Sequence, residues 1–190
     1  ALGGADVTGI NNVAIGTTSM DALTTGICNV AIGANALGAS TTGCLNVAIG
    51  RLAMGGANVT GISNIAIGNA SGHVLTTGKC NVALGESTLG ASTTGCNNIA
   101  IGLAALGGAD VTGINNIAIG TTAMDALTSG LCNIAIGTNA LGQATTGCYN
   151  IAMGESAMLA ATIGVCNVAI GVGAMSGVTT GQADSNVAIG

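Results

Sequence analysis

The sequence contains no proline, phenylalanine or tryptophan, and its one aromatic residue is Tyr149. An ordinary globular core rests on aromatic side chains that bury about 150–250 Å² each, so a core of that kind is excluded. Charged residues make up 5% of the chain, and Arg51 and Lys79 are its only lysine or arginine residues. Because binding to nucleic acid requires clustered lysine and arginine, we expect no nucleic-acid partner.

The chain is instead rich in glycine and small aliphatic residues. Glycine accounts for 34 of 190 residues and hydrophobic residues for 49%, and the mean hydropathy is +0.72. Disordered chains combine low hydropathy with high net charge, and the net charge here is −5. Collagen is excluded because there is no Gly-X-Y period. The composition therefore indicates a folded chain with an unusual, small-residue core.

A pentapeptide, Asn-(Val/Ile)-Ala-(Ile/Leu/Met)-Gly, occurs eleven times at intervals of 17 to 19 residues. A fixed period of this kind indicates a repeat architecture. Three successive intervals sum to 52, which divides one continuous array, 1–190, into units 1–52, 53–104, 105–156 and a shorter 157–190. The asparagines that open the pentapeptides are Asn12, Asn29, Asn46, Asn64, Asn81, Asn98, Asn116, Asn133, Asn150, Asn167 and Asn186.

Alternation within the pentapeptide predicts a β-strand with Val and Ile on one face and Asn and Ala on the other. Glycine follows each strand, where a turn requires positive φ, and the glycine of Thr-Thr-Gly, as at 24–26, marks a second corner. Two short strands and two corners per repeat predict an all-β parallel β-solenoid, or β-roll, of about eleven 17–18-residue coils. With coils about 4.8 Å apart, the rod is about 53 Å long. The turn glycines are Gly16, Gly33, Gly50, Gly68, Gly85, Gly102, Gly120, Gly137, Gly154 and Gly171.

Stacking of identical positions predicts ladders along the rod. We expect Val13 against Val30 and Ile15 against Ile32 to fill the interior, so that Val30→Asp would disrupt the fold. We expect the asparagines to form a second ladder of side-chain amides. Asparagine could alternatively bind a metal ion or a sugar, but its presence in every coil favours the structural interpretation.

The cysteines occupy two neighbouring positions of the repeat. Some stand one residue before the pentapeptide and others two residues before it, so Cys28 and Cys44 lie diagonally on neighbouring coils about 5.9 Å apart, within the Cα range of a disulfide. Such bridges would leave Cys166 unpaired or linked to another chain and would indicate an oxidising compartment. Against this, adjacent strand positions point to opposite faces and free cysteine also packs as a small apolar residue. The candidate pairs are Cys28 with Cys44, Cys80 with Cys96, and Cys132 with Cys148.

Residues 157–175 form an uncharged stretch long enough to span a bilayer. Its glycines weaken a helix and its Asn167 keeps the repeat register, so we expect no membrane insertion. The chain opens without a signal-peptide pattern. Neither end carries the polar cap that solenoids normally need, which predicts either a segment of a longer array or a subunit that stacks end to end.

Candidate catalytic residues are few. His73 is the single histidine, so neither a His-rich zinc site nor a Ser-His-Asp triad has its partners. The acidic residues do not occur in close pairs, and Asp6 and Asp110 share one repeat position. They are interpreted as surface charges that keep the rod soluble. We therefore expect no enzymatic activity, no metal site and no cofactor.

The repeats Asn-Val-Ala-Ile-Gly, Ala-Leu and Thr-Thr-Gly resemble those of trimeric autotransporter adhesin heads and, more closely, those of phage tail fibres. The resemblance covers nearly the whole chain. It implies a left-handed parallel β-roll, three chains side by side in a homotrimer, and a module that projects a binding tip or coats a surface.

Three functions follow as hypotheses. The leading one is a structural fibre or filament outside the cell, on the cell surface or on a virion. It would be built by self-association, as a homotrimer or an end-to-end filament, and could have an adhesive role. The second is an adhesin head or tail-fibre module that binds a host surface or matrix. The third is an ice-binding β-solenoid, since threonine ladders can order water; here the threonines are adjacent, and Val59 and Val111 replace the first of a pair.

Overall fold

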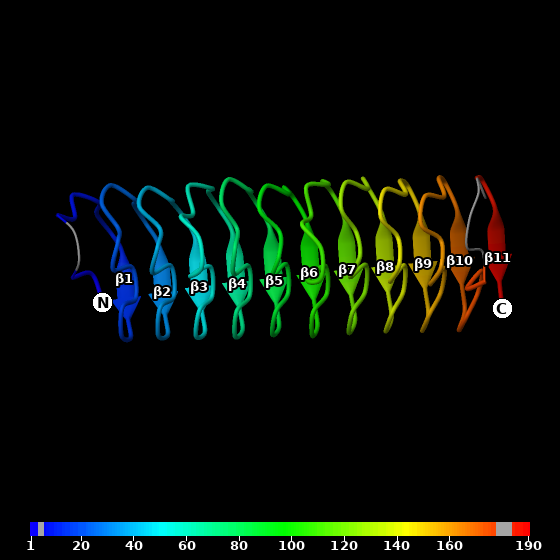
Figure 1. Cartoon of the computed structure of the whole chain (residues 1–190), viewed down its shortest axis with the longest axis horizontal. Coiled ribbons are helices and arrows are strands. Elements are labelled where there is room, and N and C mark those ends of the chain that lie inside the picture. Colours follow the sequence, from blue (N-terminus) through cyan, green and yellow to red (C-terminus); the bar gives the residue numbers. More distant parts are fainter. Residues whose placement is uncertain (4–5, 178–183) are drawn as a thin grey trace.

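Every coil of the chain contributes one short strand to a single parallel sheet. The computed structural model describes residues 1–3, 6–177 and 184–190. The sheet order follows the chain order from β1 to β11, and each strand pairs in register with the next. Figure 1 shows these strands as a straight row with loops above and below. The strands are β1 (Val13–Ile15), β2 (Val30–Ile32), β3 (Val47–Ile49), β4 (Ile65–Ile67), β5 (Val82–Leu84), β6 (Ile99–Ile101), β7 (Ile117–Ile119), β8 (Ile134–Ile136), β9 (Ile151–Met153), β10 (Val168–Ile170) and β11 (Val187–Ile189).

The fold is therefore the predicted all-β parallel β-solenoid, with coils of about 17 residues and no helix in the described residues. The extra residue of the 18-residue coils lies in the Gly-Gly-Ala-Asn and Gly-Gly-Ala-Asp loops, as at 55–58 and 107–110, and the strand register passes through it unchanged.

The expectation of two strands per coil is wrong. On the second side of the coil, pairing is reduced to isolated bridges between Cys44 and Ile62, Cys96 and Ile114, and Cys148 and Val165. The residue after this position has positive φ in every coil, as in Leu45 with φ 59°. A left-handed residue interrupts the extended chain, so no strand continues there.

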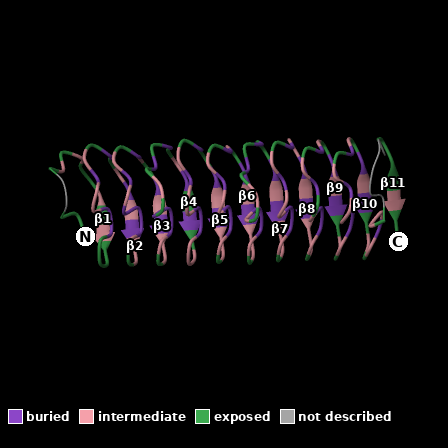
Figure 2. Cartoon of the chain, viewed as in Figure 1, coloured by how far each residue is buried: buried purple, intermediate pink, exposed green. Residues whose placement is uncertain are grey.

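The interior is built from small strand residues facing large loop residues. Middle alanines of the strands, such as Ala31 and Ala48, are fully buried. Loop residues such as Leu37 and Met54 are fully buried as well. Each fully buried Leu or Met contributes about 1.5–3 kcal/mol of burial free energy. Figure 2 shows the buried centre of the strands flanked by more exposed residues.

The predicted orientation of the strands is wrong. Val30 and Ile32 are only partly buried, Val13 and Ile15 are exposed, and the alanines between them point inward. The coil is narrow, and the large loop residues opposite the strand already fill it, so the inward strand position has room for alanine only. The expected disruption by Val30→Asp therefore loses its basis.

Candidate functional site

The inward asparagines form a continuous column of hydrogen bonds along the rod. In each of the ten coil steps, the Oδ1 atom of one asparagine accepts the backbone N–H of the next at 2.9–3.0 Å. The Nδ2 group of each asparagine from Asn12 to Asn150 also donates to a glycine carbonyl of the Thr-Thr-Gly corner or its equivalent at 2.6–2.9 Å. The column thus joins coil to coil and closes each coil on itself.

The bonding capacity of these amides is used within the protein. Asn116 donates through Nδ2 to Asn98 and Gly130, and its Oδ1 accepts from both the backbone and the side chain of Asn133. The side chain is buried. A carboxamide has two donor hydrogens and two acceptor lone pairs, so Asn116 retains none for a metal ion or a sugar.

The ten turn glycines share one backbone conformation and one close contact. Their φ angles lie between 123° and 139°, in the region that favours glycine. A β-carbon on Gly85 would lie 2.6 Å from the carbonyl oxygen of Gly102 in the next coil. Both the dihedral and the stacking distance require glycine here.

The seven cysteines are free thiols in the structure. The Cys44 thiol lies over the preceding coil, where it accepts the backbone N–H of Ile27 at 3.5 Å. Ile27 is the chain neighbour of Cys28, so the two cysteines lie on adjacent coils along one edge of the rod. The same relation holds between Cys96 and Lys79, the neighbour of Cys80. The three disulfides stay a prediction.

A column of exposed hydroxyl groups runs along another side. In the Thr-Thr-Gly corners that the structure describes, the second threonine is exposed, as in Thr25, Thr42, Thr77 and Thr94, and Thr60 and Thr112 continue the column through the 18-residue coils. The first threonine of each pair is partly buried, and its backbone N–H donates to the next coil, as from Thr24 to Thr41 at 3.0 Å. Only one threonine of each of these pairs therefore faces outward.

Asp110 and Asn58 have a structural role that the sequence analysis missed. Their Oδ1 atoms accept the backbone N–H of Thr93 and Thr41 at 2.8 and 2.9 Å, together with the threonine hydroxyls. In other coils a threonine carbonyl is the acceptor of this N–H. An Asp or Asn at the inserted residue of each long coil was the available signal, because either side chain can replace a backbone acceptor.

No metal or catalytic constellation emerges from the residues that the structure describes. No three His, Cys, Asp or Glu side chains among them gather into a metal-binding group. The His73 ring lies with Nδ1 3.3 Å from the carbonyl oxygen of Leu52, a loop contact. No helix in the described ranges has the length and apolarity to cross a bilayer.

The most unusual surface is the outer side of the sheet, which we call the Val/Ile face. It consists of the first and third residues of strands β1 to β11, in two straight ladders of aliphatic side chains without a charge. The first ladder is Val13, Val30, Val47, Ile65, Val82, Ile99, Ile117, Ile134, Ile151, Val168 and Val187, and the second is Ile15, Ile32, Ile49, Ile67, Leu84, Ile101, Ile119, Ile136, Met153, Ile170 and Ile189.

Comparison with known proteins adds no relatives: the chain matches no family, no curated protein and no solved structure. The fold shown is a parallel β-solenoid, without assignment to a family.

Proposed function

We propose that the chain is a structural module, a stiff rod of stacked β-coils in a fibre or filament outside the cell, on the cell surface or on a virion, and that it acts without catalysis. The observation that carries the proposal is the unbroken asparagine column. The same buried side chain makes the same bonds at all ten coil steps, so the polar groups of the interior serve length and rigidity.

Elongation follows from the same geometry. Each strand pairs in register with the one before it, from β1 to β11, so every added coil lengthens the rod without changing its cross-section. The repeated coil thus extends the sheet and the asparagine column together, and the number of coils sets the length of the rod.

Localisation is the most direct test of the structural role. Antibodies raised against the purified chain should label external fibres or surfaces of intact cells or particles that produce it, as seen by immunogold electron microscopy. Label confined to the cell interior would contradict the proposal.

Adhesion is the finer form of this function. The loop residue after the turn glycine is exposed in many coils and differs between them, as in Thr17, Arg51, Glu86 and Leu103, whereas the inward positions are nearly constant. Variation confined to outward residues suits recognition of a host surface or matrix. The test is to immobilise the chain and measure whether it retains host cells or matrix proteins. If it retains neither, adhesion is excluded and the structural role is unaffected.

Ice binding is a second candidate, favoured by the regular column of exposed threonine hydroxyls. Thermal hysteresis measured on the purified chain tests it. Activity that falls on Thr77→Tyr, with Glu86→Tyr as the control on another side of the rod, would support it, and absence of hysteresis would eliminate it.

A further inference from the structure

The Val/Ile face raises the question of what covers it. Its ladders run through all eleven strands; Ile65 and Ile67 of β4 are 38% and 39% exposed, and the outward residues of β5 to β8 are partly exposed. Contiguous apolar surfaces of this kind mark interaction sites. We propose that the occupant is a second copy of the chain, packed face to face and antiparallel in a two-fold dimer.

Periodicity favours a second copy over another protein. Side chains on the face recur at the coil spacing of about 4.8 Å, and the ladders interdigitate with a surface that has the same spacing, as in the dry interfaces between paired β-sheets. Figure 1 shows the strands side by side in one straight row along the rod, so the face they form is long and regular. A two-fold axis brings two such faces into contact over their full width, whereas three faces around a three-fold axis are inclined and meet along their edges.

The size of the face is sufficient. Ten coil steps and a width of about 10 Å give about 500 Å² per copy, or about 1,000 Å² in all, the lower bound for a specific interface. Exposed apolar residues at the two edges add to this area: Leu45 and Tyr149 on the edge that precedes the strands, and Leu103 on the edge that follows them.

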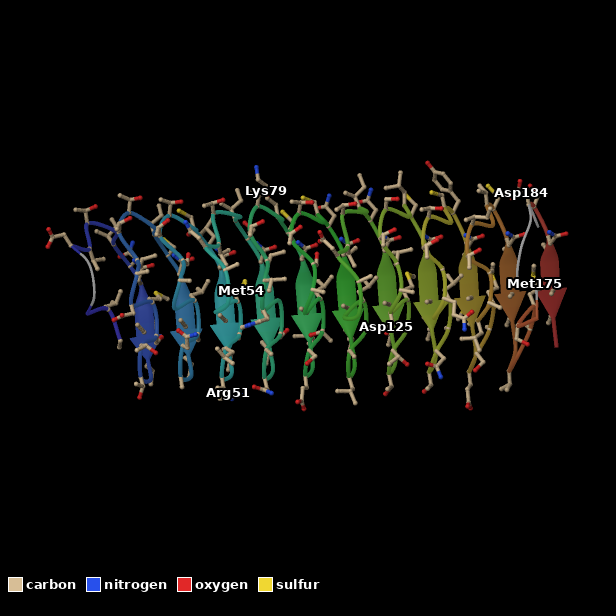
Figure 3. All side chains as sticks on the ribbon, viewed as in Figure 1. Arg51, Met54, Lys79, Asp125, Met175 and Asp184 are labelled. Carbon is tan, nitrogen blue, oxygen red and sulfur yellow. The ribbon has the colours of Figure 1, made fainter. Side chains whose placement is uncertain are left out.

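Charge and shape at these edges select the antiparallel arrangement. Full overlap of two antiparallel rods places the coil of β6 opposite itself and the coil of β3 opposite that of β9. Arg51, which follows β3 and lies at the lower edge in Figure 3, then shares an edge with Glu155, which follows β9. On the other edge, Leu45 meets Tyr149.

The same register brings Leu103, which follows β6, to the Leu103 of the second copy. Parallel rods related by a two-fold axis would instead bring opposite edges together at the same coil. Leu45 would then face Arg51, and Tyr149 would face Glu155. For these five residues the antiparallel dimer places apolar side chains opposite apolar ones and Arg51 opposite Glu155, whereas the parallel dimer places apolar side chains opposite charged ones.

Mass and shape in solution give the first test. Sedimentation equilibrium should give twice the chain mass of 17.8 kDa, and small-angle X-ray scattering should give a maximum dimension of about 50 Å, the length of one rod. A maximum dimension near twice that value would indicate end-to-end pairing and overturn the proposal. So would a trimer, or a monomer at about 100 μM, a concentration at which even weak specific dimers form.

A charge at the centre of the face gives the second test. Ile101→Lys in β6 places two lysines across the two-fold axis and should weaken dimerisation about 100-fold. The matched control is Thr112→Lys, an exposed position of the same coil on another side, which should leave dimerisation unchanged. Both variants should retain the β-sheet circular dichroism signal. Equal weakening by the two lysines would overturn the assignment of the face.

Charge reversal tests the orientation. Arg51→Glu and Glu155→Arg should each weaken the dimer by about 3- to 10-fold, and the double variant should recover the original affinity. Failure of the double variant to recover it overturns the antiparallel register.

The dimer rests on the proposed function in one respect only: both assume that the folded rod of stacked coils is the functional form of the chain. A monomeric rod found on external fibres would overturn the dimer and leave the structural role intact. A dimer found only inside cells would overturn the proposed external fibre and leave the dimer intact.

Discussion

Asn46 and Asn64 stand 18 residues apart in the chain, yet the Oδ1 atom of Asn46 accepts the backbone N–H of Asn64 at 2.9 Å. The pair spans one of the coils with an extra residue, and the bond has the same length as in the 17-residue coils. The insertion is therefore absorbed entirely in the loop. The asparagine column fixes the register of the stack independently of coil length.

Removal of one amide from the column should destabilise the whole rod. Asn116→Ala leaves the backbone N–H of Asn133 and the carbonyl oxygen of Gly130 without their side-chain partner. At about 1–3 kcal/mol for each buried group left unpaired, the free energy of unfolding should fall by about 3 kcal/mol. Urea unfolding measures it, with Thr94→Ala as the exposed control. A change no larger than that of the control would show that the column does not stabilise the fold.

Alanine at a turn glycine should be poorly tolerated. In Gly85→Ala the new methyl group meets the Gly102 carbonyl oxygen at 2.6 Å and the residue keeps a φ of 132°. We expect a loss of about 3 kcal/mol or more. Gly177→Ala, where no atom lies within 4 Å of the added carbon, should change the melting temperature little. Similar behaviour of the two variants would contradict the stacking distance at the turns.

A charge should destabilise the fold far more at the inward residue of a strand than at its outward neighbour. Ala31→Asp buries a carboxylate without a partner and should cost several kcal/mol, because a desolvated charge is expensive. Val30→Asp points outward and should cost about 1 kcal/mol or less. Unfolding is compared at low protein concentration, where association does not contribute. Greater damage from Val30→Asp would reverse the assigned faces.

Replacing a leucine that has positive φ with asparagine should stabilise the fold. Leu45 has φ 59° and is exposed, and asparagine, present at the same repeat position as Asn11, Asn97 and Asn115, tolerates this conformation better. Leu45→Asn should raise the stability of the monomer by about 0.5–1 kcal/mol, and the β-branched Leu45→Val should lower it. The ranking of the two melting temperatures is the measurement, and a more stable valine variant would be inconsistent with the assigned φ.

Oxidation should join cysteines of neighbouring coils. Non-reducing peptide mass analysis after mild oxidation should find Cys28 linked to Cys44, because the coil spacing and the one-residue offset bring them within range of a disulfide. Replacement of Cys44 by serine should abolish the Cys28 link and leave those of Cys80 and Cys132. Free thiols alone in the oxidised sample would refute the pairing.

The period of the fold was predictable from the sequence, and the faces of its strands were not. The spacing of Asn12, Asn29 and Asn46 is enough to define a coil. Alternation separates Val30 from Ala31 but does not say which side is inside. One signal was available: the middle strand residue is alanine in all eleven repeats, while its neighbours vary among Val, Ile, Leu and Met, as expected where space is limited on one side only.

Backbone conformation was the other obstacle to prediction. Residues such as Leu37, Met54 and Cys80 adopt positive φ, although side chains of these types disfavour it. Hydrogen bonds between coils hold the conformation, as from Leu37 N–H to the Ala53 carbonyl at 3.0 Å. Local propensity alone does not indicate such positions, because the constraint comes from the neighbouring coil.

Methyl–methyl nuclear Overhauser effects between successive coils would measure which face of each strand points inward. With alanine, isoleucine, leucine and valine methyl groups labelled, the Ala83 methyl should give cross-peaks to those of Ala66 and Ala100, its partners in register. The isoleucine methyl groups of β4 should give none to the buried Leu75. Cross-peaks from Ile65 or Ile67 to Leu75, with none between Ala83 and its two partners, would mean that the isoleucines and not the alanines line the interior.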